Sequence, residues 1–211
     1  MKNIIIYTLS EFNFDSGGLV VQYEFARILH NLGVNVKIVV PNKVLNPIFN
    51  IFYKGESIDY ENTLVFYSEG IEGNPFNAKH VVRWLLAPLG LCSDANVFKT
   101  YGENDLVYYF HPEDKFINEP EKVGSVYKLL NLIYVNPLAQ NNHIGKRIGT
   151  CYTLRKSHYH KNLELVHPPD SFNLDNQSSQ LELISHFNKY KYFISYDPLT
   201  FISVIAALFG R

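Results

Sequence analysis

Hydrophobic runs and helical spacing alternate along the first part of the chain. Residues 3–8 form a β-branched run that ends at a polar, glycine-containing loop. Residues 19–32 then carry apolar side chains at helical spacing, and Gly33 ends this segment before a second apolar run at 34–40. We expect a strand, a helix and a second strand here. The continuous apolar character of both strands predicts a parallel sheet covered on both faces.

The same kind of pattern continues as far as residue 135. Further strand candidates, each followed by proline, glycine or polar residues, lie at 63–67, 80–85, 105–110 and 128–135. The chain then turns polar between Asn136 and Arg147, which predicts an interdomain linker. The expected class is therefore α/β, with a Rossmann-like parallel-sheet domain over residues 1–140.

A second α/β pattern begins after this linker. Strands are expected at 149–154, 163–167 and 192–196, and helices at about 178–188 and from 199 onward. These elements predict a second, incomplete Rossmann-like domain over residues 147–211. The pattern stops inside the apolar helix that contains residues 206–211, so we expect a truncated or naturally shortened chain.

Composition narrows the class of protein. The 211 residues are 46% hydrophobic, and the formal net charge is −1, which is typical of a globular protein and disfavours nucleic acid as a partner. Cys92 and Cys151 fit neither a disulfide framework nor a metal-ligand spacing. The first residues carry only a short apolar run and no apolar run reaches about 18 residues, so we expect a cytoplasmic protein with neither a signal peptide nor a membrane span.

Two segments combine small or polar residues with the start of a predicted helix. Ser16, Gly17 and Gly18 offer backbone amides at a helix amino terminus, where a phosphate or a sugar hydroxyl would fit, although paired glycines also form ordinary turns. In the later segment, Asp197 is a natural N-cap with proline after it. The same geometry would expose the Thr200 hydroxyl and the first-turn amides to an anionic ligand.

Three stretches of the sequence resemble the retaining GT-B glycosyltransferases of the large family 4 type. "SGGLVVQYEFARILHNLGVNVKIVV" is similar to the family's double-glycine loop, helix and second strand. "HVVRWLLAPLG" resembles a stretch of some bacterial and viral members, and "YKYFISYDPLTFISVIAALFG" resembles the nucleotide-binding strand and helix. The resemblance implies a donor-binding second domain, here cut short, and an acceptor-side first domain.

The resemblance also assigns residues to the donor. Arg155 and Lys156 match the basic pair that neutralises the donor diphosphate in the family, although basic pairs on a surface are usually only solvated. Tyr196, Asp197 and Thr200 complete the implied donor site. No DxD motif occurs, so no metal and no cofactor beyond the nucleotide sugar is expected.

One position departs from the family pattern. Eight positions after the acidic residue, the family has a glutamate that holds the donor ribose, whereas this chain has Ile205 eight positions after Asp197. Isoleucine cannot accept a hydrogen bond, so ribose binding would weaken or depend on another group.

Four further residues of the first domain lie on or after predicted strands. Glu69 and His111 follow predicted strands, from which they would reach the cleft and position an acceptor hydroxyl as catalytic residues. Trp84 is expected in the core and Arg83 as a charge at a strand end. The histidines and cysteines show no metal-ligand spacing.

The function expected from these observations is transfer of a sugar from a nucleotide-sugar donor to a hydroxyl of a glycan, lipid or protein acceptor. The transfer would proceed with retention and without a metal ion. The main alternative is a degenerate or truncated transferase that acts as a non-catalytic binding module, which Ile205 favours. An NAD-dependent epimerase would need a tighter glycine fingerprint and an acidic residue where Pro41 and Asn42 end the second strand.

Overall fold

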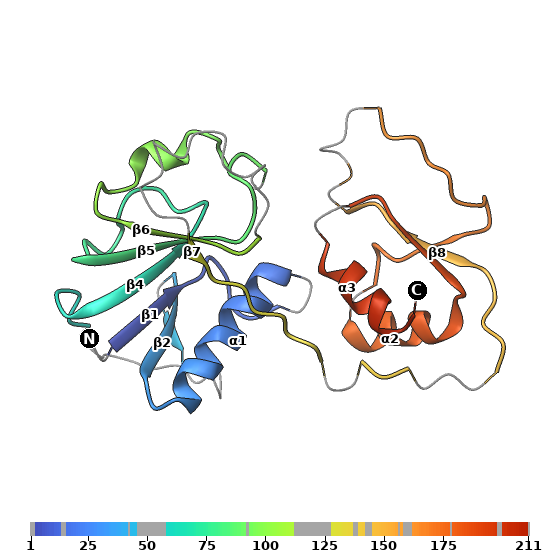
Figure 1. Cartoon of the computed structure of the whole chain (residues 1–211), viewed down its shortest axis with the longest axis horizontal. Coiled ribbons are helices and arrows are strands. Elements are labelled where there is room, and N and C mark those ends of the chain that lie inside the picture. The colour runs from blue at the N-terminus through green and yellow to red at the C-terminus, as the bar shows by residue number, and fades with distance from the viewer. Residues whose placement is uncertain are drawn as a thin grey trace. The chain divides into compact units, whose positions relative to one another are not determined.

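The computed structural model divides the chain into two compact units, which are described separately here. The first comprises residues 1–13 and 18–134, and the second comprises residues 14–17 and 135–211. Both units are drawn in Figure 1. The residues that the structure describes are 3–13, 16–41, 43–45, 58–91, 93–111, 128–136, 139–141, 145–155, 157, 162–177, 179–197 and 200–210.

The first unit is built on a seven-stranded, mostly parallel sheet. Its strands are β1 (Asn3–Tyr7), β2 (Asn35–Val40), β3 (Lys43–Leu45), β4 (Thr63–Ser68), β5 (His80–Leu85), β6 (Leu106–Tyr109) and β7 (Lys128–Leu129). Their order is β3-β2-β1-β4-β5-β6-β7, and the pairing of β2 with β3 is antiparallel while the others are parallel. The expected α/β class with a parallel sheet is confirmed for this unit.

Helix α1 (Gly17–Asn31) connects β1 to β2 and ends in a glycine-dependent turn. Gly33 has a φ of 79°, a left-handed conformation that favours glycine. Its amide donates to the carbonyl of His30 at 2.9 Å, and the amide of Val34 donates to that of Leu29 at 3.0 Å. These two bonds satisfy carbonyls at the end of the helix and turn the chain into β2, as Gly33 predicts.

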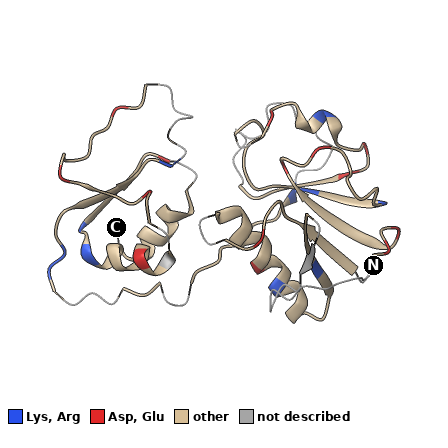
Figure 2. Cartoon of the chain, turned by 180° about the vertical axis from the view of Figure 1, so that it is seen from behind, with Lys and Arg blue, Asp and Glu red and all other residues tan. Residues whose placement is uncertain are grey.

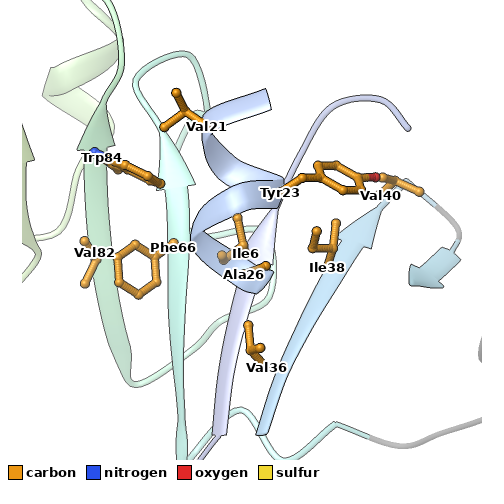
Figure 3. Packing of buried hydrophobic residues seen from close by; sticks show 10 residues of the cluster. All are labelled: Ile6, Val21, Tyr23, Ala26, Val36, Ile38, Val40, Phe66, Val82 and Trp84. Atoms are coloured by element: carbon orange, nitrogen blue, oxygen red, sulfur yellow. The ribbon is translucent and has the colours of Figure 1, made fainter. Parts of the chain in front are cut away.

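The side of α1 that faces the sheet builds the largest apolar core of the first unit. Ala26 on the helix and Ile6 and Ile38 on the strands are all 0% exposed. Figure 3 shows the helix residues lying over side chains that rise from β1, β2, β4 and β5. The buried members of this cluster are Ile6, Val21, Tyr23, Ala26, Val36, Ile38, Val40, Phe66, Val82 and Trp84. This packing holds α1 against one face of the sheet.

The opposite face of the same sheet encloses a buried arginine. Arg83 is 0% exposed, and its Nε donates to Asp105 Oδ2 at 2.6 Å. Its two terminal nitrogens donate to the carbonyls of Ile71, at 3.0 Å, and of Gly73. Arg83 therefore ties the β4–β5 connection to the start of β6, and its prediction as a strand-end charge is wrong.

Two tyrosine rings complete the surroundings of Arg83. The guanidinium carbon lies 5.0 Å from the ring centroid of Tyr67 and 4.3 Å from that of Tyr101. Burial raises the pKa of Tyr67 to about 12 and raises that of Tyr101 further, because the charged phenolate is poorly solvated inside the fold. The cation and the two neutral phenols form one packed unit.

The second unit contains a small sheet whose strands are all parallel. Its strands are β8 (Thr150–Thr153), β9 (Phe172–Asn173) and β10 (Tyr192–Ser195), in the order β10-β8-β9, and its helices are α2 (Gln180–Lys189) and α3 (Phe201–Leu208). The expected strand at 163–167 is wrong, because those residues form no ladder and the strand that pairs with β8 is β9. The second α/β pattern is otherwise confirmed.

Both helices of the second unit pack on one face of its sheet. The buried cluster comprises Cys151, Leu174, Leu183, Phe187, Ile202, Ile205, Ala206 and Phe209. Cys151 is 1% exposed and is a free thiol, and burial raises its pKa to about 12. Because successive side chains of a strand alternate between faces, Tyr152 lies on the face opposite Cys151 and the helices.

Arg147 joins the carboxyl ends of the two helices of this unit. Its Nε donates to the carbonyl of Asn188 at 3.2 Å, and its Nη1 donates to the carbonyl of Phe209 at 3.0 Å. Carbonyl groups at a helix end lack partners within the helix and carry partial negative charge, so a cation there is favourable. Arg147, the last residue of the predicted linker, thus belongs to the packed second unit.

In the described portion of the chain, no helix is long and apolar enough to cross a membrane. Figure 2 shows basic and acidic residues interspersed over both units, which agrees with the formal net charge of −1.

Candidate functional site

The carboxyl ends of parallel strands are where α/β sheets bind ligands, above all where the chain reverses its direction across the sheet. In the first sheet this point lies between β1 and β4, because β2 pairs with one side of β1 and β4 with the other. In the second sheet β8 is central, with β9 and β10 on its two sides. The predicted site residues that follow strands lie at these two edges.

Three of the predicted donor residues lie at the carboxyl edge of the second sheet. Arg155 follows β8, and Tyr196 and Asp197 follow β10, its direct neighbour. Since parallel strands end at the same edge, these residues come from adjacent strand ends. Lys156, the other member of the basic pair, lies outside the described residues.

A carboxylate from the third strand organises the end of β8. Asp175, just after β9, accepts from the amide of Leu154 at 2.9 Å, from that of Arg155 at 3.4 Å, and from the hydroxyl of Thr153. Arg155 has a φ of 28°, which is unusual for a residue with a side chain. Asp175 occupies the concavity of successive amides that would otherwise suit an external anion. A donor phosphate at this edge would therefore depend on the Arg155 side chain.

The hydroxyl of Tyr196 is engaged inside the unit. It accepts from the amides of Val166 at 2.8 Å and His167 at 3.0 Å, and it lies 2.9 Å from Nδ1 of His167. A phenol has two acceptor lone pairs and one proton, so these three contacts use its whole hydrogen-bonding capacity. Tyr196 is 7% exposed, and its hydroxyl holds the backbone of Val166 and His167 in place at this edge of the sheet.

The start of α3 differs from the expectation. The N-cap is Thr200, whose hydroxyl accepts from the amide of Ile202 at 3.3 Å, so the assignment of Asp197 as N-cap is wrong. Thr200 is 8% exposed and Asp197 is 1% exposed, which places both side chains inside the fold. The side chain of Ser195 donates to the carbonyl of Asp197 at 2.8 Å and shapes the turn after β10.

Ile205 is part of the apolar core of the second unit. It is 6% exposed and lies in the cluster formed by α2, α3 and the sheet. The position where the resembled family has a ribose-binding glutamate is thus a packing position here. A group for a donor ribose would have to come from another residue.

At the carboxyl edge of the first sheet, Glu69 follows β4 and is 8% exposed. Its Oε2 accepts from the amide of Leu86 at 3.1 Å, and its carbonyl accepts from the hydroxyl of Tyr101 at 2.5 Å. The carboxylate therefore binds the backbone just beyond β5. Tyr101 also packs on Arg83, so the buried arginine helps to fix the loop that carries Glu69.

His111 lies at the same edge, beyond β6, and its ring meets that of Phe110 edge-on at 4.9 Å. Strand β5 separates β4 from β6, so Glu69 and His111 follow strands that are not direct neighbours. Two strand spacings amount to about 10 Å, which leaves room for a substrate group between them.

The double glycine lies within helix α1. Gly17 is the first residue of the helix and Gly18 follows it, while Ser16 immediately precedes it. The predicted glycine loop is therefore the first turn of a helix, and the amides of Gly17 and Gly18 are among its amino-terminal donors.

Sequence reasoning missed Asp175, His167 and the Arg83–Asp105 pair. Their sequence context gives weak signals: Asp175 lies between Leu174 and Asn176 in a polar stretch, and His167 precedes two prolines. Among the described residues, no group of three or more histidine, cysteine, aspartate or glutamate side chains is arranged to hold a metal ion.

Comparison with known proteins adds no relative. No protein-family model matches the chain, and no curated protein and no solved structure matches it either.

Proposed function

We propose that this chain is a glycosyltransferase of the two-domain GT-B type, which moves a sugar from a nucleotide-sugar donor to an acceptor hydroxyl with retention. The second unit would bind the donor, and the first unit would present a glycan, lipid or protein acceptor. The sequence resemblance to retaining family 4 enzymes suggests this reaction, and the two sheets, one mostly and one entirely parallel, are compatible with it.

One observation carries the proposal. Arg155 and Asp197 follow adjacent parallel strands, β8 and β10, at the carboxyl edge of a sheet whose central strand is β8. A cation fixed at this edge suits a diphosphate leaving group, whose negative charge grows as the bond to the sugar breaks. The backbone amides at the start of α3 would also favour a negatively charged diphosphate.

Catalysis in this proposal depends mainly on orientation and charge. The enzyme would hold the donor and the acceptor in a reactive geometry, and the Arg155 guanidinium would stabilise the departing nucleotide without a metal ion. In the first unit, Glu69 and His111 would position the acceptor hydroxyl between the ends of β4 and β6. Gly17 and Gly18 would supply the amides of the first turn of α1 to an acceptor or a phosphate.

A second function is favoured by Ile205. Its place in the apolar core leaves no carboxylate at the position where the resembled family binds ribose. A degenerate transferase that binds a ligand without turnover fits this observation. The two functions differ in whether a nucleoside diphosphate is released from a sugar conjugate.

Titration calorimetry of the full chain with UDP, GDP, ADP, CMP and their common sugar conjugates tests the proposal. We expect one diphosphate to bind and Arg155→Ala to weaken it at least about tenfold, as loss of a charge-assisted hydrogen bond implies. Lys191→Ala is the matched control, because Lys191 precedes β10 and so lies at the opposite edge of the sheet. Binding by no nucleotide would refute the proposal, and binding without release of diphosphate from any conjugate would favour the non-catalytic function.

A further inference from the structure

Residues 162–170 form a segment of the second unit, here called the strap, that lies between β8 and β9 in the chain. Every residue of the strap is exposed except His167. Within the described chain, the hydrogen bonds that tie the strap to the sheet all end on one atom, the hydroxyl oxygen of Tyr196. The strap is therefore attached to the unit through a single histidine and its neighbouring amides.

The ring of His167 is held on two sides. It stacks on Tyr152 of β8 with ring centroids 3.7 Å apart and an interplanar angle of 14°. Its Nδ1 lies 2.9 Å from the hydroxyl of Tyr196, which follows β10. These contacts place the strap across neighbouring strands of the sheet, close to their carboxyl ends.

Hydrogen-bond valence fixes the protonation state of His167 in this arrangement. The Tyr196 hydroxyl accepts from the amides of Val166 and His167, at 2.8 and 3.0 Å, so both of its lone pairs are in use. Its one proton must then point to Nδ1 of His167, and that nitrogen must carry a lone pair. The ring is consequently neutral, with its proton on Nε2.

We propose that the strap is a proton-controlled cover beside the carboxyl edge of the second sheet: neutral His167 holds it down, and protonation of His167 releases it. A proton taken from solvent adds to Nδ1, which then presents an N–H to an oxygen that has no lone pair left for it. The bond from Tyr196 to His167 is lost, and the new N–H competes with the amides of Val166 and His167 for the same oxygen, which weakens the remaining attachment of the strap. Histidine is the side chain that changes charge near physiological pH.

The groups near His167 come from the ends of the three strands and from the strap itself. The described groups in contact with the ring are Tyr152 on β8 and Tyr196 after β10. Among the described residues, the charged groups that follow the strands at this edge are Arg155, Asp175 and Asp197. Glu164 and Asp170, the carboxylates of the strap itself, are exposed.

Nuclear magnetic resonance of the full chain tests the protonation state directly. Long-range ¹H–¹⁵N correlation at about pH 7.5 should show Nε2 protonated and Nδ1 unprotonated in His167. The hydrogen-exchange protection factors of the Val166 and His167 amides should fall about 5- to 30-fold by about pH 5.5, the effect of losing one or two net hydrogen bonds. Protonated Nδ1 at the higher pH, or protection that changes less than about twofold, would overturn the proposal.

Three variants distinguish release of the strap from general destabilisation of the second unit. Tyr196→Phe should lower protection of both amides already at the higher pH, and His167→Gln should abolish the pH dependence. His186→Gln is the matched control, because His186 lies on α2 in the same unit and binds Gln177 at 3.0 Å instead of the strap. A pH dependence that persists in His167→Gln but disappears in His186→Gln would assign the effect to the wrong histidine and refute the proposal.

An effect of the strap on donor binding rests on the proposed function, and calorimetry with UDP, GDP and ADP at both pH values tests it separately. We expect nucleotide affinity to change with pH in the wild type and not in His167→Gln. A nucleotide affinity that does not change with pH in either the wild type or His167→Gln would refute control of donor binding by the strap. A strap that opens while no nucleotide binds would refute the proposed function and support the proton control.

Discussion

Replacement of the buried Arg83 by methionine should strongly destabilise the first unit. The substitution leaves the Asp105 carboxylate, whose side chain is 10% exposed, without its 2.6 Å partner, and it removes donors from the carbonyls of Ile71 and Gly73. Breaking a buried ion pair by removing one partner costs about 3–5 kcal/mol. Asp105 keeps the amide of Gly102 at 3.0 Å, so we expect a loss near the lower end, about 3 kcal/mol.

Urea unfolding followed by tryptophan fluorescence measures this loss. The chain has one tryptophan, Trp84, which is 0% exposed and donates from Nε1 to the carbonyl of Leu130 at 2.9 Å, so its emission reports on the first unit. With a slope of about 2 kcal/mol per molar urea, the midpoint should fall by about 1.5 M.

Two comparisons decide whether the unpaired buried charge causes the loss of stability in Arg83→Met. Arg27→Met removes an exposed partner of Glu24 on α1 and should cost less than about 1 kcal/mol. Arg83→Met combined with Asp105→Asn should recover part of the loss, because no uncompensated carboxylate remains. A loss in Arg83→Met no larger than that in Arg27→Met, or a double variant no more stable than Arg83→Met, would refute the reasoning.

Three further predictions concern stability. Arg147→Met should destabilise the second unit by about 1–3 kcal/mol, because the carbonyls of Asn188 and Phe209 lose a charged donor, and hydrogen exchange of α2 and α3 amides should report it. The pKa of Tyr67 is raised to about 12 by burial, so the unfolded state ionises first and stability is lost as pH rises from about 10 to 12; urea midpoints of Tyr67→Phe should fall less steeply over that range. The pKa of His186 is lowered by burial and by Lys189, so the stability that depends on neutral His186 is present above the ordinary histidine pKa and is lost as pH falls below it. The hydrogen-exchange protection of β8 amides should therefore fall less in acid in His186→Gln than in the wild type. An equal fall in both proteins would exclude His186 as the source of the acid destabilisation.

The sequence predicts the fold best where hydrophobic runs are continuous. The strand at 80–85 coincides with β5, and Gly33 ends α1 as expected, because buried parallel strands and glycine turns leave strong local signals. The expected strand at 163–167 fails since its apolar residues are exposed: Leu165 is 52% and Val166 70% exposed. Apolar composition alone did not reveal that the segment has no partner strand.

The candidate site was predicted less completely, because its contacts join residues far apart in the chain. The strand ends at Arg155 and Asp197 follow from the α/β pattern, since parallel strands end together. The Asp175 carboxylate, 20 residues from Arg155, and the Tyr196 hydroxyl, 29 residues from His167, find their partners only after the sheet has formed. The error in the N-cap is a local one: Asp197 lies in the turn after β10, where its carbonyl accepts from the hydroxyl of Ser195, and Thr200 caps α3 instead.

The central claim is that the carboxyl edge of the second sheet binds a nucleotide diphosphate through Arg155. The most direct measurement is calorimetric titration of the wild type, Arg155→Ala and Lys191→Ala with UDP, GDP and ADP. The account predicts that one nucleotide binds the wild type and Lys191→Ala equally and binds Arg155→Ala at least about tenfold more weakly. Equal binding to all three proteins, or binding to none, would contradict it.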